Sequence, residues 1–231
     1  MLATPGQRLA EKPYLRRLQR YCPLLDDDVT ALESRLGRIE VHPAGKDLGL
    51  SSSPPMFLLS GWACLAHSLS DGRRQILGFL LPGDGVGFDL LTRSQRSVEA
   101  LAMTSLKVRY VLPDLAFGGG RLGRAFAGAA AAQQARMISQ MVRLGQQTAH
   151  ERMAHLLLEL HGRLAEIGDT RGDSFHLPIK QEVLADALGL SLVHINRILQ
   201  QMRRDRLIDM HAGQVTLLDR ARLEAAADQG G

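Results

Sequence analysis

The side chains best suited to recognise a ligand through hydrogen bonds lie in residues 181–204, QEVLADALGLSLVHINRILQQMRR. Read as a helix, the second half presents one polar face, made of Val193, Asn196, Arg197, Gln200, Arg203 and Arg204, with His194 on its flank. Arginine can form two hydrogen bonds with guanine, asparagine can pair with adenine, and a small apolar group can contact the thymine methyl group. The residue types therefore predict reading of bases in a DNA major groove.

The opposite face of the same segment fits a helix-turn-helix. Two apolar sets have helical spacing: Val183, Leu184 and Leu188, then Ile195, Ile198, Leu199 and Met202. Ala185 offers a small side chain where two helices cross, Gly189 permits a sharp turn, and Ser191 can cap the second helix. A charged helix face is more often only solvated surface. The relative spacing of Ala185 and Gly189 favours DNA binding over that alternative.

The residues around the helix pair extend this prediction. Arg203, Arg204 and Arg206 suit contacts to phosphates, which position a helix without selecting sequence. Lys180 and Gln181, at the start of the first helix, are also predicted DNA contacts. The segment RLIDMHAGQVTLLD has two short apolar runs around Ala212-Gly213, which predicts a β-hairpin. A hairpin directly after the second helix makes a winged helix-turn-helix.

Composition places these elements in an ordinary globular protein. The 231 residues are 45% hydrophobic and 23% charged, with a formal net charge of +4, so we expect about two domains. No apolar run is long enough to span a membrane, and the N-terminus lacks a secretory signal, so we expect a cytoplasmic protein with no membrane partner. Cys22 and Cys64 are too few and too far apart for a disulfide framework. No nucleophile–base pair or metal-ligand cluster indicates an enzyme or a metal site.

The region from Ile39 to Val111 has a different pattern. Short apolar runs are separated by turn residues, which predicts an antiparallel roll or barrel. Asp71-Gly72, in SLSDGRRQILGFL, indicates a hairpin because glycine tolerates the positive φ of a tight turn. A lead-in helix and a second helix are expected before this region, around Leu15 and Leu32.

A long helical pattern follows the glycines at 118–120. One stripe with alternating spacings of three and four residues is formed by Ala127, Ala130, Gln134, Met137, Met141, Leu144 and Thr148. Such a stripe suits a parallel helix pair between two subunits. The alternative is a helix packed on its own β domain. A single helix of this length would be unusual, so we expect a break between Gln146 and Glu151.

With these parts assembled, the chain resembles the Crp/Fnr superfamily of bacterial transcription regulators over residues 15–225. The resemblance is carried by FLLSGWACLAHSLSDGRRQILGFLLPGDGVGFD, QRSVEALAMTSLKV, ERMAHLLLEL and LPIKQEVLADALGLSLVHINRILQQMRRDRLI. It implies an α+β fold with a cyclic-nucleotide-binding-like β-roll with N-terminal helices (1–117), a dimerisation helix (118–148) and a winged helix-turn-helix domain (149–231). Arg197 matches the arginine that family members place on guanine.

The resemblance also identifies a candidate effector pocket, formed by Gly87, Phe88, Asp89, Arg96, Ser97, Met137 and Ile138. Members that bind cyclic AMP carry a G-E-L segment, which Gly87-Phe88-Asp89 replaces here. The helix positions that should supply a hydroxyl are Met137 and Ile138. Cyclic AMP is therefore not expected, although Arg96 could hold another anion. An iron–sulfur cluster of the Fnr type needs four thiolates and is excluded by the two cysteines.

The leading hypothesis is a homodimeric transcription regulator that binds a palindromic operator in double-stranded DNA, as two-fold symmetry requires. RNA polymerase would be a further partner of an activator. The alternative is a ligand-binding regulatory module that acts on a protein partner. The face of Arg197, Arg203 and Arg204 argues against this alternative, and salt-dependent binding to duplex DNA would decide between the two.

Overall fold

The computed structural model describes residues 12–50, 52–88, 98–112 and 119–228. The chain divides into two compact units. The first combines Met1–Ser68 with Phe79–Arg136, and the second combines Leu69–Gly78 with Met137–Gly231. These units differ from the segments predicted from the sequence, because the division falls inside a long helix and because the tip of one hairpin belongs to the second unit.

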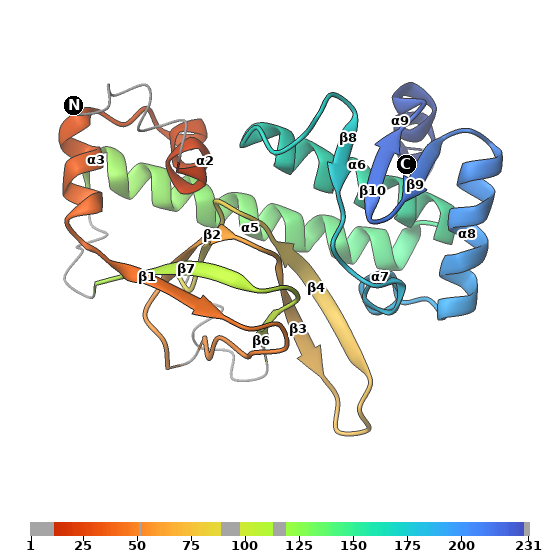
Figure 1. Ribbon diagram of the computed structural model, residues 1–231, viewed down its shortest axis with the longest axis horizontal. Helices are drawn as coiled ribbons and strands as arrows, with labels where there is room; N and C mark the ends of the chain where they lie inside the picture. Colours follow the sequence, from red (N-terminus) through yellow and green to blue (C-terminus); the bar gives the residue numbers. More distant parts are fainter. Residues whose placement is uncertain (1–11, 51, 89–97, 113–118, 229–231) are drawn as a thin grey trace. The chain divides into compact units, whose positions relative to one another are not determined.

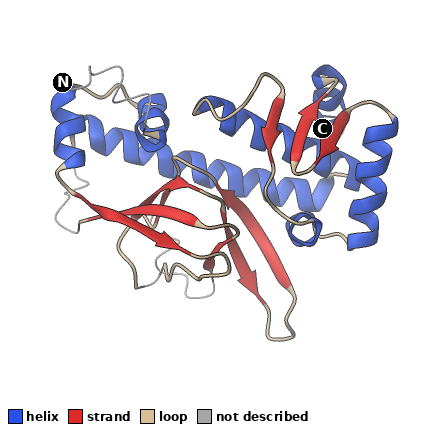
Figure 2. Cartoon of the chain, viewed as in Figure 1, coloured by secondary structure: helices blue, strands red, loops and turns tan. Residues whose placement is uncertain are grey.

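The first unit is built mainly from antiparallel strands, shown in Figure 2 as red arrows. One sheet has the order β1-β7-β2-β5 and the other β4-β3-β6. The prediction of an antiparallel roll is confirmed. Its elements are α2 (Pro13–Tyr21), α3 (Asp26–Glu33), β1 (Leu36–His42), β2 (Met56–Ser60), β3 (Ala63–Ser68), β5 (Gly85–Val86), β6 (Glu99–Ala102) and β7 (Leu106–Val111). The strand β4 (Arg74–Leu80) is divided, because Arg74–Gly78 belong to the second unit and only its last two residues to the first.

Two tight turns carry the residues that the sequence marked as turns. Gly72 has φ +87° and lies between β3 and β4, where Leu69 N–H donates to the Arg73 carbonyl at 2.8 Å. Gly83 has φ +89°, and the Asp84 N–H donates to the Leu81 carbonyl at 3.0 Å. Asp84 also accepts the Leu81 N–H through its carboxylate at 2.8 Å. Both turns are therefore structural β-turns.

An aromatic cluster forms part of the core of the first unit. Tyr14 of α2 stacks on Phe57 of β2, with ring centroids 5.0 Å apart. Phe88 stacks on Phe126 of the helix α5 (Gly120–Gln146) at 4.9 Å. At Gly128 of α5, an added Cβ atom would lie 2.5 Å from the Cβ of Tyr21. Only glycine allows α2 to approach α5 this closely.

Ionic contacts tie α2 and α3 to the roll. Glu33 receives hydrogen bonds from Arg109 at 3.0 Å and from Tyr14, and pairs with Lys12 at 2.8 Å. Burial alone would raise the pKa of Glu33, but these three partners outweigh it and hold that pKa below its ordinary value. Burial, followed by the Glu33 carboxylate, raises the pKa of Tyr14.

The second unit contains the C-terminal part of α5 and a small helical domain. Its remaining elements are α6 (Ala149–Glu166), β8 (Ser174–His176), α7 (Gln181–Leu188), α8 (Leu192–Arg204), β9 (Ile208–His211), β10 (Gln214–Leu217) and α9 (Arg220–Asp228). The strands lie side by side in the order β8-β10-β9, next to α8 (Figure 1).

The break between α5 and α6 falls within the predicted interval. Thr148 ends the connection and caps α6 in a reciprocal capping box with Glu151, in which each side chain accepts the other residue's backbone N–H. Gln147 is buried at the break and donates to the Ala227 carbonyl of α9 at 3.0 Å. Among the described residues, no helix is both long and apolar enough to cross a membrane.

Candidate nucleic-acid interface

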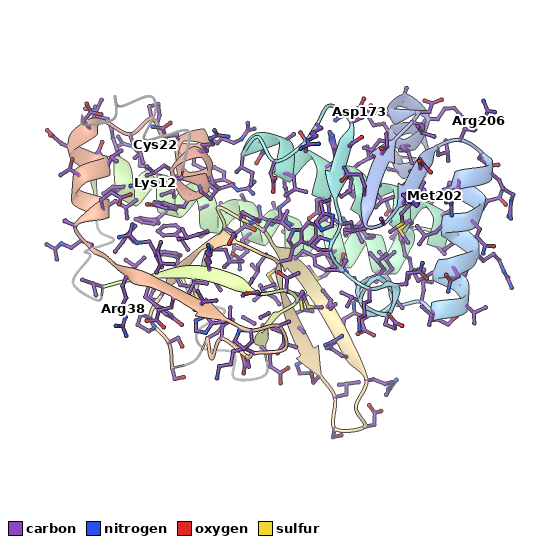
Figure 3. All side chains as sticks on the ribbon, viewed as in Figure 1. Lys12, Cys22, Arg38, Asp173, Met202 and Arg206 are labelled. Carbon is purple, nitrogen blue, oxygen red and sulfur yellow. The ribbon has the colours of Figure 1, made fainter. Side chains whose placement is uncertain are left out.

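Helices α7 and α8 form the helix-turn-helix that the sequence predicts. Gly189 ends α7 with φ +64° and ψ +40°, in the left-handed region that favours glycine. The Leu190 N–H then donates to the Ala185 carbonyl at 3.1 Å, which closes the turn. All seven residues assigned to the apolar face are buried: Val183, Leu184, Leu188, Ile195, Ile198, Leu199 and Met202. Figure 3 shows Met202 on the side of α8 that faces the sheet.

The N-terminus of α8 is fixed by its cap. The Ser191 side chain accepts the His194 backbone N–H at 3.2 Å, and no acidic residue lies in the first turn. The predicted contact residues Val193, His194, Arg197, Gln200, Arg203 and Arg204 are exposed, with Val193 exposed by 69%. Lys180 is exposed at the start of α7, where Gln181 is half-buried. The exposed predicted contacts therefore lie along one face of α8, and Lys180 is exposed at the start of α7.

Two of the predicted contact residues are engaged within α8. Asn196 is half-buried, and its Nδ2 donates to the Leu192 carbonyl at 3.1 Å. Arg204 donates to the Gln201 side chain at 2.7 Å. Asn196 would have to release this bond to reach a base, whereas Arg204 keeps further N–H donors for a phosphate.

The wing forms around Ala212-Gly213 as expected. The four residue pairs of β9 and β10 run from Ile208↔Leu217 to His211↔Gln214. Ala212 and Gly213 have φ +49° and +79°, so both central residues of the turn are left-handed, as in type I′ hairpins. Arg206 also has positive φ and lies just beyond the end of α8, where Figure 3 labels it. The exposed arginines thus continue from α8 towards the wing.

The residues that hold the C-terminal end of α7 carry no recognisable signal in the sequence. The carbonyls of its last three residues each accept a hydrogen bond from another segment. Gln75 Nε2 donates to Asp186 O at 2.9 Å, Gln140 Nε2 to Ala187 O at 2.6 Å, and Arg152 Nη1 to Leu188 O at 3.0 Å. We call Gln75, Gln140 and Arg152 the α7 clasp. All three residues lie in the second unit.

The residues of the predicted dimer stripe on α5 differ in how far they are exposed. Gln134, Met141 and Thr148 are exposed, but Met137 and Leu144 are partly covered by their own chain. Ile138 is 56% exposed and Met141 65%. The exposed positions with alternating spacings of four and three are Ala127, Ala131, Gln134, Ile138, Met141 and Gly145, which we call the α5 seam. The seam shares Ala127, Gln134 and Met141 with the predicted stripe, and which of the two sets contacts a partner stays a prediction.

The candidate effector pocket is only partly described. Asp89, Arg96 and Ser97 lie outside the described residues. Gly87 has φ +77°, and Phe88 packs between Phe57 and Phe126, with centroids 4.9 Å from each. A cavity of about 20 Å³, lined by Arg17, Asp84, Phe88, Gln133 and Arg136 among others, remains beside it. This volume holds about one water molecule.

The cysteines and the possible metal-binding side chains are the remaining candidates for a redox or metal site. Cys22 and Cys64 are buried as free thiols, and Cys64 contacts the Met103 sulfur at 3.4 Å. In the described part of the chain, no group of three or more His, Cys, Asp or Glu side chains is arranged to hold a metal ion.

Comparison with known proteins agrees with this geometry. Residues 151–226 match the Crp-like helix-turn-helix domain, and residues 55–117 match the cyclic nucleotide-binding domain. The chain is 34% identical to the nitrogen fixation regulation protein FixK of Bradyrhizobium diazoefficiens, covering 74% of this chain and 72% of that protein. It is 32% identical to the transcriptional activatory protein AadR of Rhodopseudomonas palustris, with the same two coverages.

Solved structures show the same fold. FixK2 from Bradyrhizobium japonicum aligns with a TM-score of 0.73 at 27% identity, covering 84% of this chain and 98% of that chain. A regulator of the CRP/FNR family from Thermus thermophilus aligns with a TM-score of 0.64 at 22% identity, covering 84% of this chain and all of the other.

Proposed function

The chain belongs to the Crp/Fnr family of DNA-binding transcription regulators, and from this premise we propose that it binds a palindromic operator as a homodimer, with α8 of each subunit in the major groove. The observation that carries this proposal is the division of α8 into two faces. Its apolar face is buried in the second unit, while the opposite face exposes Arg197, Gln200 and Arg203. That leaves base-reading and phosphate-binding groups together on one helix.

The residues of this surface have separable roles in the proposal. Arg197 pairs with guanine, Gln200 with adenine, and Val193 contacts a thymine methyl group. Asn196 reads a base after releasing the Leu192 carbonyl. Arg203, Arg204 and Lys180 bind phosphates and fix the position of α8 along the duplex.

The α5 seam is the proposed dimer interface. It is exposed along α5 and contains Ile138 and Met141, two large apolar side chains that would otherwise remain in water. A parallel pair of α5 helices would bury them around a two-fold axis. The same axis would relate the two operator half-sites, about 34 Å or one helical turn apart.

We also propose that cyclic AMP does not control this protein. Phe88 takes the place of the glutamate in the family's G-E-L segment and packs against Phe57 and Phe126. Met137 and Ile138 supply no hydroxyl group. Four-thiolate cluster chemistry is likewise outside the proposal, because the sequence contains two cysteines. Isothermal titration with cyclic AMP should give no binding heat; saturable binding would contradict this part of the proposal.

The relatives FixK and AadR are named as a regulation protein and an activatory protein. By extension, activation of transcription, with RNA polymerase as the further partner, is the proposed output. Transcription in vitro from a promoter that carries the selected operator, with and without the protein, would test it. A fall in transcript would instead make the protein a repressor.

The decisive experiment for DNA recognition is selection of bound sequences from random duplexes by the full chain. We expect an enriched palindrome whose half-sites are one helical turn apart. Affinity for that duplex should fall steeply between about 50 and 200 mM salt, because phosphate contacts release counterions. Enrichment of no sequence, or of a single half-site without symmetry, would overturn the proposed mode of binding.

A further inference from the structure

The C-terminal end of α7 is an unusual point of attachment. The last carbonyls of a helix have no partners within the helix and commonly bond to water or to the following turn. Here the carbonyls of Asp186, Ala187 and Leu188 accept side-chain donors of the α7 clasp, which come from β4, α5 and α6. Gly189 and the start of α8 follow directly. The clasp therefore holds the chain immediately before the recognition helix.

The amide of Gln140 can adopt only one orientation in this site. Arg143 donates to Gln140 Oε1 at 2.7 Å, and an arginine has no acceptor to offer in exchange. The Nε2 atom of Gln140 consequently faces the carbonyls of Ala187 and Ile76, at 2.6 and 3.3 Å. Gln140 is only 6% exposed and Arg143 only 2%. A buried amide with all its bonds fixed acts as a rigid connector between α5 and α7.

Arg143 is itself fixed by α6. Its Nη2 lies 2.5 Å from a carboxylate oxygen of Glu159, whose other oxygen accepts from Arg163 at 3.2 Å. Because the ion pair with Glu159 holds Arg143 in place, the Gln140 amide cannot rotate without losing its hydrogen bond to Arg143.

The start of β4 is also attached to the C-terminal end of α7. Arg74 donates two hydrogen bonds to Asp186 Oδ2, at 2.6 and 3.0 Å. Gln75 donates to the backbone carbonyls of Asp186 and Ile76. Residues 69–78 thus belong to the second unit through polar contacts to α7.

Gln140 and the α5 seam lie on opposite sides of α5. At 100° per residue, Gln140 is rotated by about 160° from Ile138 and by about 100° from Met141. Under the proposed homodimer, the seam contacts the partner at the two-fold axis while Gln140 contacts α7. A chain of contacts therefore runs from the axis through Gln140 to the end of α7 and on to α8.

We propose that Gln140 is a positioning residue that, together with Gln75, sets the distance of each recognition helix from the dimer axis and so selects the spacing of the operator half-sites. This inference rests on the proposed homodimer. Gln140 contacts no DNA in this role. It acts through its hydrogen bond to the carbonyl of Ala187, which lies two residues before Gly189, where the turn between α7 and α8 begins.

The test uses the full chain and a series of duplexes in which the two selected half-sites are moved one or two base pairs closer together or farther apart. Each base pair changes the separation by about 3.4 Å and rotates one half-site relative to the other. The variant is Gln140→Glu, which keeps the volume and the Arg143 partner but faces carbonyl oxygens with a carboxylate. Gln146→Glu, an exposed position on the same helix, is the charge-matched control.

For the wild type and Gln146→Glu we expect one preferred spacing. For Gln140→Glu, the affinity ratio between the preferred spacing and its neighbours should fall about fivefold, the effect of one lost hydrogen bond. The ratio between the affinity for the selected half-site and the affinity for a half-site with one base changed should stay as in the wild type. A smaller folded fraction would weaken apparent binding to every duplex by the same factor and leave both ratios unchanged, so a fall in the spacing ratio alone reports positioning rather than stability.

Gln75→Ala provides a second route, because its half-buried position in a hairpin makes it tolerant of truncation. It should also reduce spacing selectivity. An unchanged spacing ratio in both variants would overturn the inference while leaving the proposed homodimer intact. Equal losses of spacing and base discrimination would overturn it as well. If the wild type itself shows no spacing preference, the palindromic homodimer fails, and this inference fails with it.

Discussion

Ser191 Oγ accepts the backbone N–H of His194 at 3.2 Å and thereby fixes the first turn of the recognition helix. Ser191→Ala should destabilise the protein by about 1 kcal/mol, since the cap bond is lost, whereas Ser191→Gly should cost only a few tenths. Urea denaturation would measure both. Ser139→Ala, inside α5, is a control without a capping role, and a cost at Ser139 equal to that at Ser191 would contradict the assignment.

Arg197 and Arg204 should differ in what they contribute to DNA binding. Arg197→Ala should cost about 1 to 3 kcal/mol of discrimination between operator and altered sequences, because a bidentate contact to guanine is lost. Arg204→Ala should weaken binding to operator and random DNA alike and reduce the salt dependence. Fluorescence anisotropy at several salt concentrations would measure both effects. Equal losses on operator and random DNA for Arg197→Ala would remove its base-reading role.

The α5 seam leads to a prediction about assembly. Met141→Glu would place two carboxylates near the two-fold axis of a parallel pair, so dimer association should weaken by at least about tenfold. Gln146→Glu, which is exposed but outside the seam, should leave association unchanged. Sedimentation equilibrium would report the dissociation constants. A Met141→Glu protein as dimeric as the wild type would move the interface elsewhere.

Gly128 marks a close contact between α2 and α5 that can be tested by stability. Gly128→Ala would bring a methyl group to 2.5 Å from Tyr21, so a loss of about 1 to 3 kcal/mol is expected from overpacking. Helix propensity alone would predict a gain of up to about 1 kcal/mol. Gly162→Ala in α6 is the matched control, since nothing lies within 4 Å of its added Cβ. Thermal unfolding should therefore move in opposite directions for the two variants.

Glu33 should make the stability of the protein depend on pH. Because its folded pKa is lower than its unfolded pKa, the stabilisation is present above the unfolded pKa and is lost as pH falls through the folded pKa. Glu33→Gln should therefore flatten the decline in unfolding free energy between neutral pH and about pH 3. Asp71 is an exposed carboxylate whose pKa is also lowered, first by the Arg73 backbone, and Asp71→Asn serves for comparison. A slope unchanged by Glu33→Gln would contradict the role of this cluster.

The helix-turn-helix could be predicted because every signal for it is local. Gly189, Ser191 and the two apolar sets lie within about twenty residues, and each acts on its own backbone or its nearest neighbour. The same holds for the Asp71-Gly72 turn and for the break at Thr148. In such segments the same short-range interactions determine both the sequence pattern and the local structure.

The α7 clasp could not be predicted, because its members are far apart in sequence. Gln75 and Ala187 are separated by 112 positions, and no periodicity links them. A glutamine on a helix is ordinarily read as solvated, so Gln140 carried no signal of burial. On α5, Met137 and Leu144 of the predicted stripe are half-buried in their own chain, which their spacing alone did not indicate. Helical spacing defines several adjacent stripes, and only the contacts of the folded chain decide which one remains exposed.

The arrangement on α5 has a consequence for how such regulators diversify. Ile138 and Met141 flank Gln140 in sequence, yet they are exposed whereas Gln140 is buried and bonded to the Ala187 carbonyl of α7. Under the proposed homodimer, substitutions at 138 or 141 would alter which chains pair while position 140 keeps its geometry, and substitutions at 140 would leave the pairing surface unchanged. Insertion of a single residue between Ile138 and Gln140 would rotate these two side chains relative to each other by about 100° around the helix axis. Lineages of this protein are thus free to change by point substitution in this stretch but not by small insertions or deletions.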